Sequence, residues 1–333
     1  MRALISNAPG GPETLILGEL PDPVAGEGEV LVRVKACAVN FPDVLIIEDK
    51  YQFRPERPFA PGGEIAGVIE AVGAGVTGWQ VGDRVFGWVL ANGMAELAKV
   101  KANDLFRLPA HRSFAEGASI LLTYGTAIHA LLDRGQAKPG ETMLVLGAAG
   151  GVGVAAIELG KALGLRVIAA VSSEEKAAFA REVGADEALI YGRGPLDRDA
   201  SKALANMFKQ AAGPDGAQIV FDPVGGDYAE PALRSLGWEG RYLVVGFPAG
   251  IPRLPLNLTL LKSCDIRGVF WGAFVERSPD ANRTNVDRLM AMWDAGQISP
   301  RITATYALAR GGDAIDAMTG RAVMGKIVVL LDE

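Results

Sequence analysis

The chain is poor in the residues that build metal sites and disulfide frameworks. Its 333 residues include two cysteines, Cys37 and Cys264, and two histidines, His111 and His129. So few cysteines exclude a disulfide scaffold and a cysteine-held zinc lobe. His111 lies in a loop and His129 in an apolar segment, so both are interpreted as structural and no metal is expected. The low cysteine content fits a reducing compartment, and we expect a cytoplasmic protein.

The chain also lacks an excess of basic charge and a long apolar run. Its formal net charge is −6, with acidic and basic residues interspersed, which argues against nucleic-acid binding. No apolar run reaches the roughly 20 residues of a membrane span, so no membrane segment is expected. A hydrophobic content of 49% supplies a large core, and the length suggests about two domains.

Short strands bounded by turn residues dominate the chain up to about residue 108. Ser113 and Glu116 then form a capping box, after which apolar residues recur at helical spacing to residue 132. Strands and helices alternate from there to about residue 247, which predicts a parallel, doubly wound sheet. Helices are expected near residues 152–163, 174–183, 201–211, 228–236 and 282–295. The segment IRGVFWGAF is predicted to be a strand.

A glycine-rich loop lies between the first strand and the first helix of this alternation. LVLGAAGGVGV carries the spacing of a dinucleotide-binding fingerprint, with Ala148 in the place of the first glycine. We expect Ala148 to make the turn, Gly150 to admit a pyrophosphate and Gly153 to let the helix pack closely. The amino end of the helix then faces the phosphates. The alternative is a packing turn of small residues.

The end of the second strand carries hydroxyls where NAD-binding sites place an acid. Ser172 and Ser173 occupy this strand end, and Lys176 lies one helical turn further on. Small hydroxyls beside an ammonium suit the 2′-phosphate of NADPH better than the free ribose of NADH. The alternative is that Ser173 only caps the helix and that Lys176 is only solvated.

Several motifs together resemble the medium-chain dehydrogenase/reductase superfamily, in its zinc-free quinone oxidoreductase (zeta-crystallin-like) branch. They are AVNFPDVLIIEDKY, PFAPGGEIAGVIEAVG, VGDRVFG, TYGTA, GAAGGVGVAAIELGKALG, SSEEK, FDPVGG and GKIVVL. The resemblance implies a Rossmann-type parallel sheet domain inserted into a mostly β, GroES-like catalytic domain. The expected boundaries are residues 1–121 and 267–333 for the catalytic domain, and 122–266 for the dinucleotide-binding domain.

The resemblance also implies an activity. Asn40 stands where zinc-dependent relatives have a metal ligand, and Gly62-Gly63-Glu64 lacks the histidine of their Gly-His-Glu motif. Without a zinc Lewis acid, the easier hydride acceptors are conjugated ones. We expect an NADPH-dependent reductase of quinones or other conjugated carbonyl compounds. The alternatives are an enoyl-thioester or 2-haloacrylate-type alkene reductase, and an NADPH-binding protein with little catalysis. Arg54 and Arg57 are solvated loop charges or, alternatively, a cationic pair that attracts a carboxylate or CoA phosphates.

Site residues are carried over from the same resemblance. The expected catalytic residues are Asn40, Tyr51 and Thr126. The expected cofactor contacts are Asn40, Thr126, Ala149, Gly150, Gly151, Val152, Ser172, Lys176, Tyr191, Phe247, Val269, Phe270, Trp271 and Lys326. The family further suggests a homodimer, in which residues 265–270 pair across an exposed sheet edge.

Overall fold

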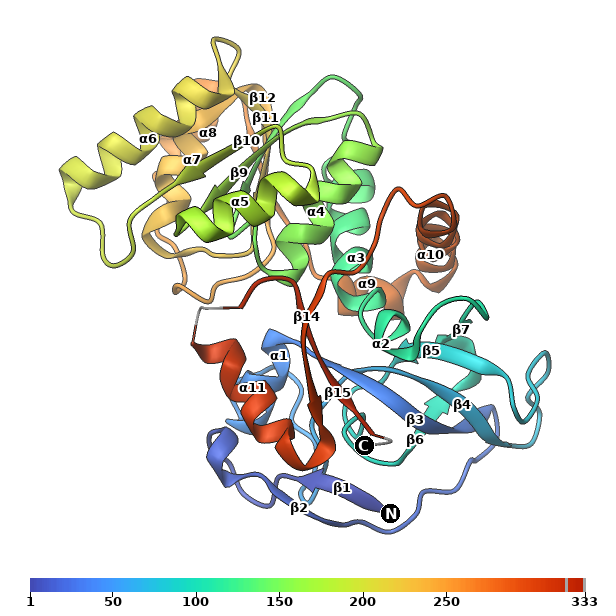
Figure 1. Cartoon of the computed structure of the whole chain (residues 1–333). Helices are drawn as coiled ribbons and strands as arrows, with labels where there is room; N and C mark the ends of the chain where they lie inside the picture. Colours follow the sequence, from blue (N-terminus) through green and yellow to red (C-terminus); the bar gives the residue numbers. More distant parts are fainter. Residues whose placement is uncertain (321–322, 332–333) are drawn as a thin grey trace. The chain divides into compact units, whose positions relative to one another are not determined.

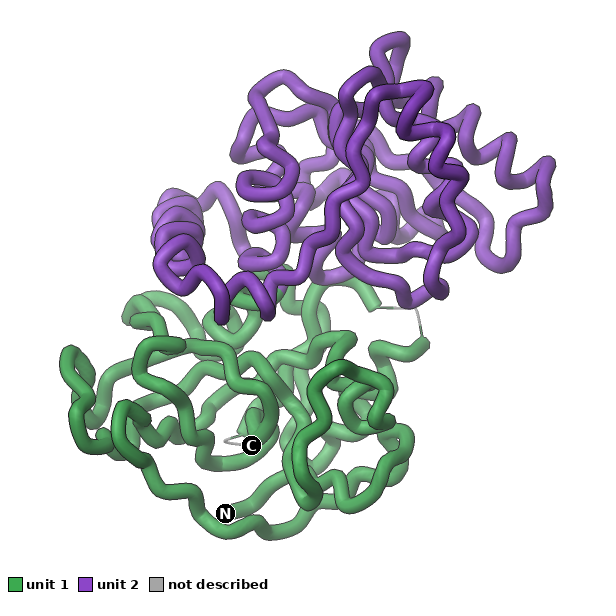
Figure 2. Tube along the Cα trace, turned by 180° about the vertical axis from the view of Figure 1, so that it is seen from behind, with its two compact units in different colours: residues 1–122, 300–333 green, residues 123–299 purple. Residues whose placement is uncertain are grey.

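The computed structural model describes residues 1–320 and 323–331. It divides into two compact units, Met1–Leu122 with Pro300–Glu333 as unit 1, and Thr123–Ser299 as unit 2 (Figure 2). Residues 267–299, which the sequence assigned to the first domain, cluster with unit 2. Residues 321–322 and 332–333 of the predicted catalytic domain lie outside the described residues. Within the described ranges, no helix has the length and apolar character needed to cross a membrane.

Unit 1 is built on a mostly antiparallel sheet in the order β14-β15-β3-β4-β5-β7, with β6 paired to β3 (Figure 1). Its strands are β3 (Glu29–Val39), β4 (Glu64–Val72), β5 (Arg84–Trp88), β6 (Leu97–Lys101), β7 (Leu105–Arg107), β14 (Ile302–Ala307) and β15 (Lys326–Leu330). A separate hairpin joins β1 (Arg2–Ile5) to β2 (Ile16–Glu19). β15, near the end of the chain, pairs with β3, near its start. The C-terminal segment therefore returns to the first domain, as predicted.

The helices of unit 1 are α1 (Phe41–Ile47), α2 (Phe114–Gly117) and α11 (Gly311–Thr319). The predicted capping box opens α2: Ser113 Oγ accepts the Glu116 N–H at 3.2 Å, and Glu116 accepts the Ser113 N–H at 2.8 Å. The helical pattern after it is broken into α2 and α3 (Leu121–Ile128), and the end of α3 continues as a π-helical segment, His129–Arg134.

Unit 2 contains a parallel sheet in the order β10-β9-β8-β11-β12-β13. Its strands are β8 (Thr142–Leu146), β9 (Arg166–Val171), β10 (Glu187–Ile190), β11 (Ala217–Asp222), β12 (Leu236–Val244) and β13 (Asp265–Gly268). The order reverses between β8 and β11, which is the doubly wound Rossmann arrangement. The predicted fold class, a Rossmann-type domain inserted into a mostly β domain, is confirmed.

Helices flank this sheet (Figure 1). Those that contact its strands are α4 (Gly151–Ala162), α5 (Glu174–Val183), α6 (Arg198–Ala212), α7 (Ala229–Ser235) and α8 (Asn257–Lys262). The two helices that follow, α9 (Trp271–Arg277) and α10 (Pro279–Asp294), contact each other. The predicted strand IRGVFWGAF is wrong in its second half, because β13 ends at Gly268 and α9 begins at Trp271. The Trp271 side chain is 5% exposed, and its Nε1 donates to Asn282 Oδ1 at 3.2 Å. This contact with α10 holds the segment in unit 2.

Candidate functional site

The glycine loop joins β8 to α4. The left-handed residue of its turn is Gly147, with φ of 57°, and Ala148 is fully buried behind it. Ala148 lies inside the turn, as expected, because the Gly150 N–H donates to Gly147 O across it, and the left-handed conformation that favours glycine falls on Gly147. Gly150 is the N-cap of α4, with an extended backbone.

Two further glycines of the loop have the geometry that the fingerprint requires. A Cβ placed on Gly153 would lie 2.5 Å from Gly147 O and 2.7 Å from Ala148 Cα, so α4 packs against the loop without room for a side chain. A Cβ on Gly150 would meet only Gly147 O, at 3.5 Å. The backbone at Gly150 therefore leaves space on one side, which a ligand can approach closely.

The amino end of α4 supplies the electrostatics of an anion site. The first N–H groups of a helix have no carbonyl partner within the helix, and the end carries a partial positive charge. The first turn of α4 contains no acidic residue, and the Gly150 N–H donates to Gly147 O at 3.0 Å. Of the predicted contacts Ala149, Gly150, Gly151 and Val152, the first-turn N–H groups of Gly151 and Val152 are thus the donors best placed for a phosphate. The loop follows β8 at the point where the strand order reverses, where ligands of such sheets bind.

A cluster of hydroxyls and cations lies beyond the end of β9. Ser173 caps α5, because its Oγ accepts the Lys176 N–H at 3.3 Å. The neighbouring hydroxyl, Ser172 Oγ, accepts from Arg193 Nη2 at 3.2 Å. Burial lowers the pKa of Lys176, the positive charge of Arg193 lowers it further, and the negative charge of Glu175 raises it. Ser172 and Lys176 are predicted from the sequence, whereas Arg193 is not, although it lies just after the third strand.

Tyr191 follows β10 and is buried beside the glycine loop. Burial raises its pKa to about 12, against a hydrogen bond from the Gly147 backbone that favours the phenolate. Its ring centroid is 4.9 Å from that of Tyr228. Tyr191 therefore supports the turn at Gly147 directly, whatever it contacts on a ligand.

The residues expected near the nicotinamide follow β12 and β13. Phe247 is 45% exposed, and Phe270 is 55% exposed. The Val269 N–H donates to Val244 O at 2.9 Å, which extends the pairing of the two strands. Phe247 and Phe270 thus remain available to a ligand at the carboxyl ends of the strands, whereas the Val269 N–H is already used.

Trp271 and Thr126 differ in availability. The Trp271 indole covers Gly125 so closely that a Cβ there would lie 2.9 Å from it, so this side chain serves packing. Thr126, the next residue of α3, is partly buried. Among the described residues, none forms a hydrogen bond with the Thr126 hydroxyl, which leaves that group for a ligand.

In unit 1, Asn40 belongs to a buried polar cluster with Glu64 and Lys326. These side chains are 5%, 0% and 4% exposed. Lys326 Nζ donates to Asn40 Oδ1 at 2.7 Å and to Glu64 Oε2 at 2.9 Å. Asn40 Nδ2 donates to Glu64 Oε2 at 3.1 Å and to Ala38 O at 3.3 Å. The sequence shows Glu64 only as the last residue of a motif and does not predict its ion pair with Lys326.

Asp43 and Tyr51 lie beside this cluster. Asp43 Oδ2 accepts the Asn40 N–H at 2.7 Å as part of the capping box of α1. Burial raises the pKa of Asp43 to about 7. Burial also raises the pKa of the partly buried Tyr51, and the negative charge of Asp43 raises it further. Tyr51 therefore carries its phenolic proton at neutral pH and can act as a hydrogen-bond donor.

The cationic loop that could attract CoA phosphates is partly committed to the fold. Arg57 Nη1 donates to Asp49 at 2.8 Å, and its Nη2 donates to Ile47 O at 2.9 Å. Arg57 is therefore not a free cation, which weakens the interpretation of Arg54 and Arg57 as a pair that binds acyl-thioester phosphates.

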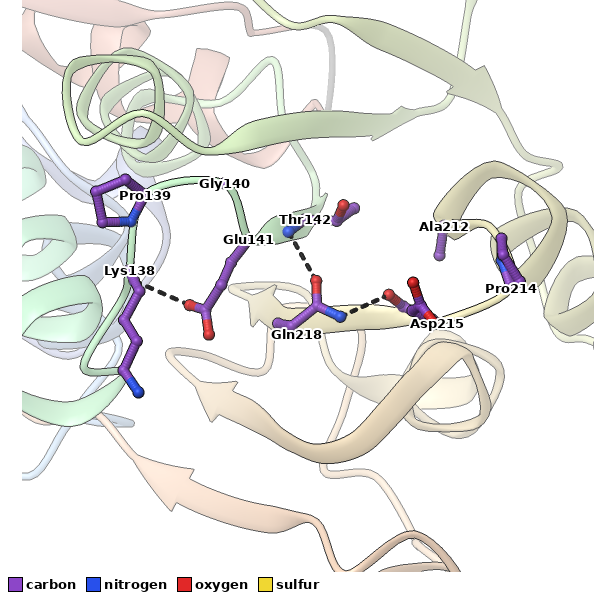
Figure 3. A pocket seen from close by; sticks show the side chains of 10 residues that line it. Lys138, Pro139, Gly140, Glu141, Thr142, Ala212, Pro214, Asp215 and Gln218 are labelled. Atoms are coloured by element: carbon purple, nitrogen blue, oxygen red, sulfur yellow. Dashed lines mark hydrogen bonds between the residues drawn. The ribbon is translucent and has the colours of Figure 1, made fainter.

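A polar pocket of about 450 Å³ lies at the opposite end of the parallel strands from the glycine loop (Figure 3). Its wall includes Glu141, which accepts the Lys138 N–H at 2.9 Å, and Gln218, which accepts the Thr142 N–H at 2.8 Å. Arg241 holds Glu141 with both of its Nη atoms, at 3.0 and 2.6 Å. These groups tie β8, β11 and β12 together at their amino ends. None of the predicted cofactor residues lines this pocket.

Comparisons with known proteins agree with this geometry. The family description "Alcohol dehydrogenase GroES-like domain" matches residues 26–110, and "Zinc-binding dehydrogenase" matches residues 151–288. Quinone oxidoreductase-like protein 2 of Bos taurus is 37% identical to this chain over 95% of it and 89% of the relative. The chain belongs to the quinone oxidoreductase branch of the medium-chain dehydrogenases/reductases.

Two solved structures of similar fold are described as complexes with NADPH. A mycobacterial protein complexed with NADPH has a TM-score of 0.91 and 30% identity, covering 99% of this chain and 100% of its own. Escherichia coli quinone oxidoreductase complexed with NADPH has a TM-score of 0.88 and 26% identity, with coverages of 99% and 100%. The family and fold predicted from the motifs are confirmed, and the predicted cofactor agrees with the one named in these two structures.

Proposed function

We propose that this quinone oxidoreductase family member is an NADPH-dependent reductase of quinones or other conjugated carbonyl compounds that works without zinc. The observation that carries the proposal is the glycine loop at the reversal of strand order, with Ser172, Lys176 and Arg193 beyond the next strand. When bound, NADPH supplies a hydride to the acceptor, and the acceptor also takes up one proton to give the reduced product. The names of the relatives support the reaction class.

The donor chemistry of unit 1 supports a reaction without zinc. Zinc sites need thiolate, imidazole or carboxylate ligands. The chain has Asn40 and Gly63 where the zinc-dependent pattern has ligands, and the carboxylate of the same motif, Glu64, is paired with the Lys326 ammonium at 2.9 Å. Among the described residues, no three His, Cys, Asp or Glu side chains gather around a common point. The residues therefore do not fit the metal that the name of one matched family suggests.

The cluster beyond β9 supports NADPH over NADH. A 2′-phosphate carries negative charge that Lys176 and Arg193 can neutralise, and Ser172 holds the guanidinium in place at 3.2 Å. Glu174 and Glu175 are exposed in the first turn of α5, where acids favour the helix, and neither occupies the strand end.

The proposed roles of Asn40, Tyr51 and Thr126 follow from their remaining hydrogen-bond capacity. Both N–H groups of the Asn40 amide donate within the fold, and its Oδ1 accepts from the Lys326 ammonium. Asn40 thus acts as an acceptor, which suits a ribose hydroxyl and not a substrate carbonyl. Tyr51 donates its phenolic proton toward the developing oxyanion, and the Thr126 hydroxyl meets the nicotinamide carboxamide.

An acceptor panel tests this function. NADPH oxidation is followed by absorbance with quinones, enals, enones and acyl thioesters side by side, and each reaction is repeated with NADH. We expect saturable quinone or enone reduction with NADPH preferred. Replacing Lys176 or Arg193 by Ala should each raise the KM for NADPH about fivefold to tenfold and leave the KM for NADH unchanged. Turnover of thioesters alone favours the alkene-reductase alternative, and tight NADPH binding without any turnover ends the proposal.

We also propose a cytoplasmic homodimer. Within the sheet order, β13 is an end strand paired with β12 alone. Close to it in the chain, Leu256, Leu260 and Leu261 are 69%, 80% and 65% exposed. An edge strand and exposed leucines are each typical of an interface. Sedimentation at micromolar concentration should give a dimer, and Leu260→Arg should give a monomer; a monomeric wild type contradicts the assignment.

The cytoplasmic location is supported by the two cysteines. Both are free and buried, which fits a reducing compartment.

A further inference from the structure

The chain passes between the two units twice, and one buried carboxyl group binds a residue at or near each passage. The first passage lies inside α3, between Leu122 and Thr123, and the second between Ser299 and Pro300. Glu158, on α4, is 5% exposed. Its Oε2 accepts the Tyr124 hydroxyl at 2.7 Å and the Ser299 N–H at 2.7 Å.

The two groups that Glu158 holds are close to the passages themselves. Tyr124 is 1% exposed and lies two residues after Leu122. Ser299 carries the last backbone N–H of unit 2 before the second passage, and Pro300, which follows it, has no backbone N–H. The adjacent Ile298 is 1% exposed, so this anchor is buried as well. Glu158 therefore holds both segments of unit 2 that connect to unit 1.

A second buried carboxyl group holds α3 on the other side of the first passage. Glu64 Oε1 accepts the Leu122 N–H at 2.9 Å, while its Oε2 binds Lys326 and Asn40. The start of α3 is thus tied to the polar cluster of unit 1, and its next turn is tied to α4.

The helix that carries Glu158 also carries the cofactor loop. Glu158 lies seven residues after Gly151, the first residue of α4, which is roughly 10 Å along the helix axis. A rigid helix of this length links the phosphate-binding end to the anchor. We propose that Glu158 is a positioning residue that ties both passages to the helix on which the cofactor diphosphate rests. The kinetic part of this inference rests on the proposed function.

Two variants of Glu158 test the inference. Glu158→Ala leaves the Tyr124 hydroxyl and the Ser299 N–H without this acceptor, whereas Glu158→Gln keeps a side chain of the same size and a carbonyl oxygen. Hydrogen exchange is measured on the whole chain, over residues 121–126 and 295–302. We expect Glu158→Ala to speed exchange of the Ser299 amide about tenfold, and Glu158→Gln to stay close to wild type.

The kinetic readout separates positioning from simple stability. We expect the kcat for the best acceptor to fall about tenfold in Glu158→Ala and to be restored by Glu158→Gln, while the dissociation constant of NADPH changes less than about twofold. Lys161→Met is the matched control on α4, since Lys161 pairs with Asp186 at 2.7 Å and contacts neither passage. It should change neither exchange at Ser299 nor kcat.

Two results overturn the inference. Unchanged Ser299 exchange and unchanged kcat in Glu158→Ala overturn it. A loss of NADPH affinity that accounts for the whole kinetic effect also overturns it, because Glu158 then acts through the glycine loop. If Glu158→Ala does not fold, Tyr124→Phe removes one of the two bonds and must show the same kcat loss on a smaller scale. If wild type reduces no acceptor, the proposed function fails, while exchange and NADPH affinity still decide the role of Glu158.

Discussion

Removing the Lys326 ammonium should destabilise the fold more than removing any exposed cation. Lys326 and Glu64 are 4% and 0% exposed in their side chains and lie 2.9 Å apart. Lys326→Met keeps the length and apolar stem of the side chain but leaves the Glu64 carboxylate buried without its counter-charge. Breaking a buried pair in this way costs about 3–5 kcal/mol. The loss also frees Asn40 Oδ1, which accepts from Lys326 at 2.7 Å.

Urea unfolding followed by tryptophan fluorescence measures this effect. Lys161→Met is again the control, because the side chains of Lys161 and Asp186 are both 38% exposed. Such an exposed pair contributes about 0–1 kcal/mol. The double variant Lys326→Met with Glu64→Gln removes the buried charge and should recover at least half of the loss. A Lys326→Met cost no larger than that of Lys161→Met would refute the claim that Lys326 compensates Glu64, and with it the claim that the Glu64 carboxylate is not available to a metal.

Two further predictions concern the loop and a buried acid. Gly153→Ala places a Cβ 2.5 Å from Gly147 O, so NADPH affinity should fall at least about tenfold by fluorescence titration, while Gly272→Ala, whose nearest contact is 3.7 Å away, should leave it unchanged. Burial raises the pKa of Asp43 to about 7, so its contribution to the free energy of unfolding is fully present below about pH 4 and is lost as the pH rises through 7. Between about pH 4 and pH 7, the free energy of unfolding in urea should fall less in Asp43→Asn than in the wild type. An identical pH profile in the two proteins contradicts the assignment.

Local patterns in the sequence were sufficient to predict the fold class. Alternating strands and helices, the capping box at Ser113 and the glycines at 150 and 153 each report on a few neighbouring residues, and the structure places them as expected. Ala148 lies in the predicted turn, whereas the positive φ of Gly147 was not predicted from the sequence. The helix at Trp271 was predicted as a strand, since a run of apolar and aromatic residues does not show that the indole packs on Gly125.

The contacts that the sequence could not show join residues far apart in the chain. Lys326 and Glu64 are separated by 262 residues, and Ser299 and Glu158 by 141. Arg193 meets Ser172 across 21 residues, through the packing of one strand end on the next. No local periodicity reports such pairs, because tertiary packing alone brings them together. The resemblance pointed to Lys326 and Asn40, and the structure adds Glu64, the partner that holds both.

The proposed reaction depends on where NADPH binds: its diphosphate on the amino end of α4, and its 2′-phosphate between Lys176 and Arg193. A crystal structure of the chain with NADPH decides this. We expect diphosphate density within hydrogen-bond distance of the Gly151 and Val152 N–H groups, and phosphate density at the ends of Lys176 and Arg193. Density at any other edge of the sheet, or a bound zinc ion beside Glu64 in place of the Lys326 ammonium, would contradict the proposal.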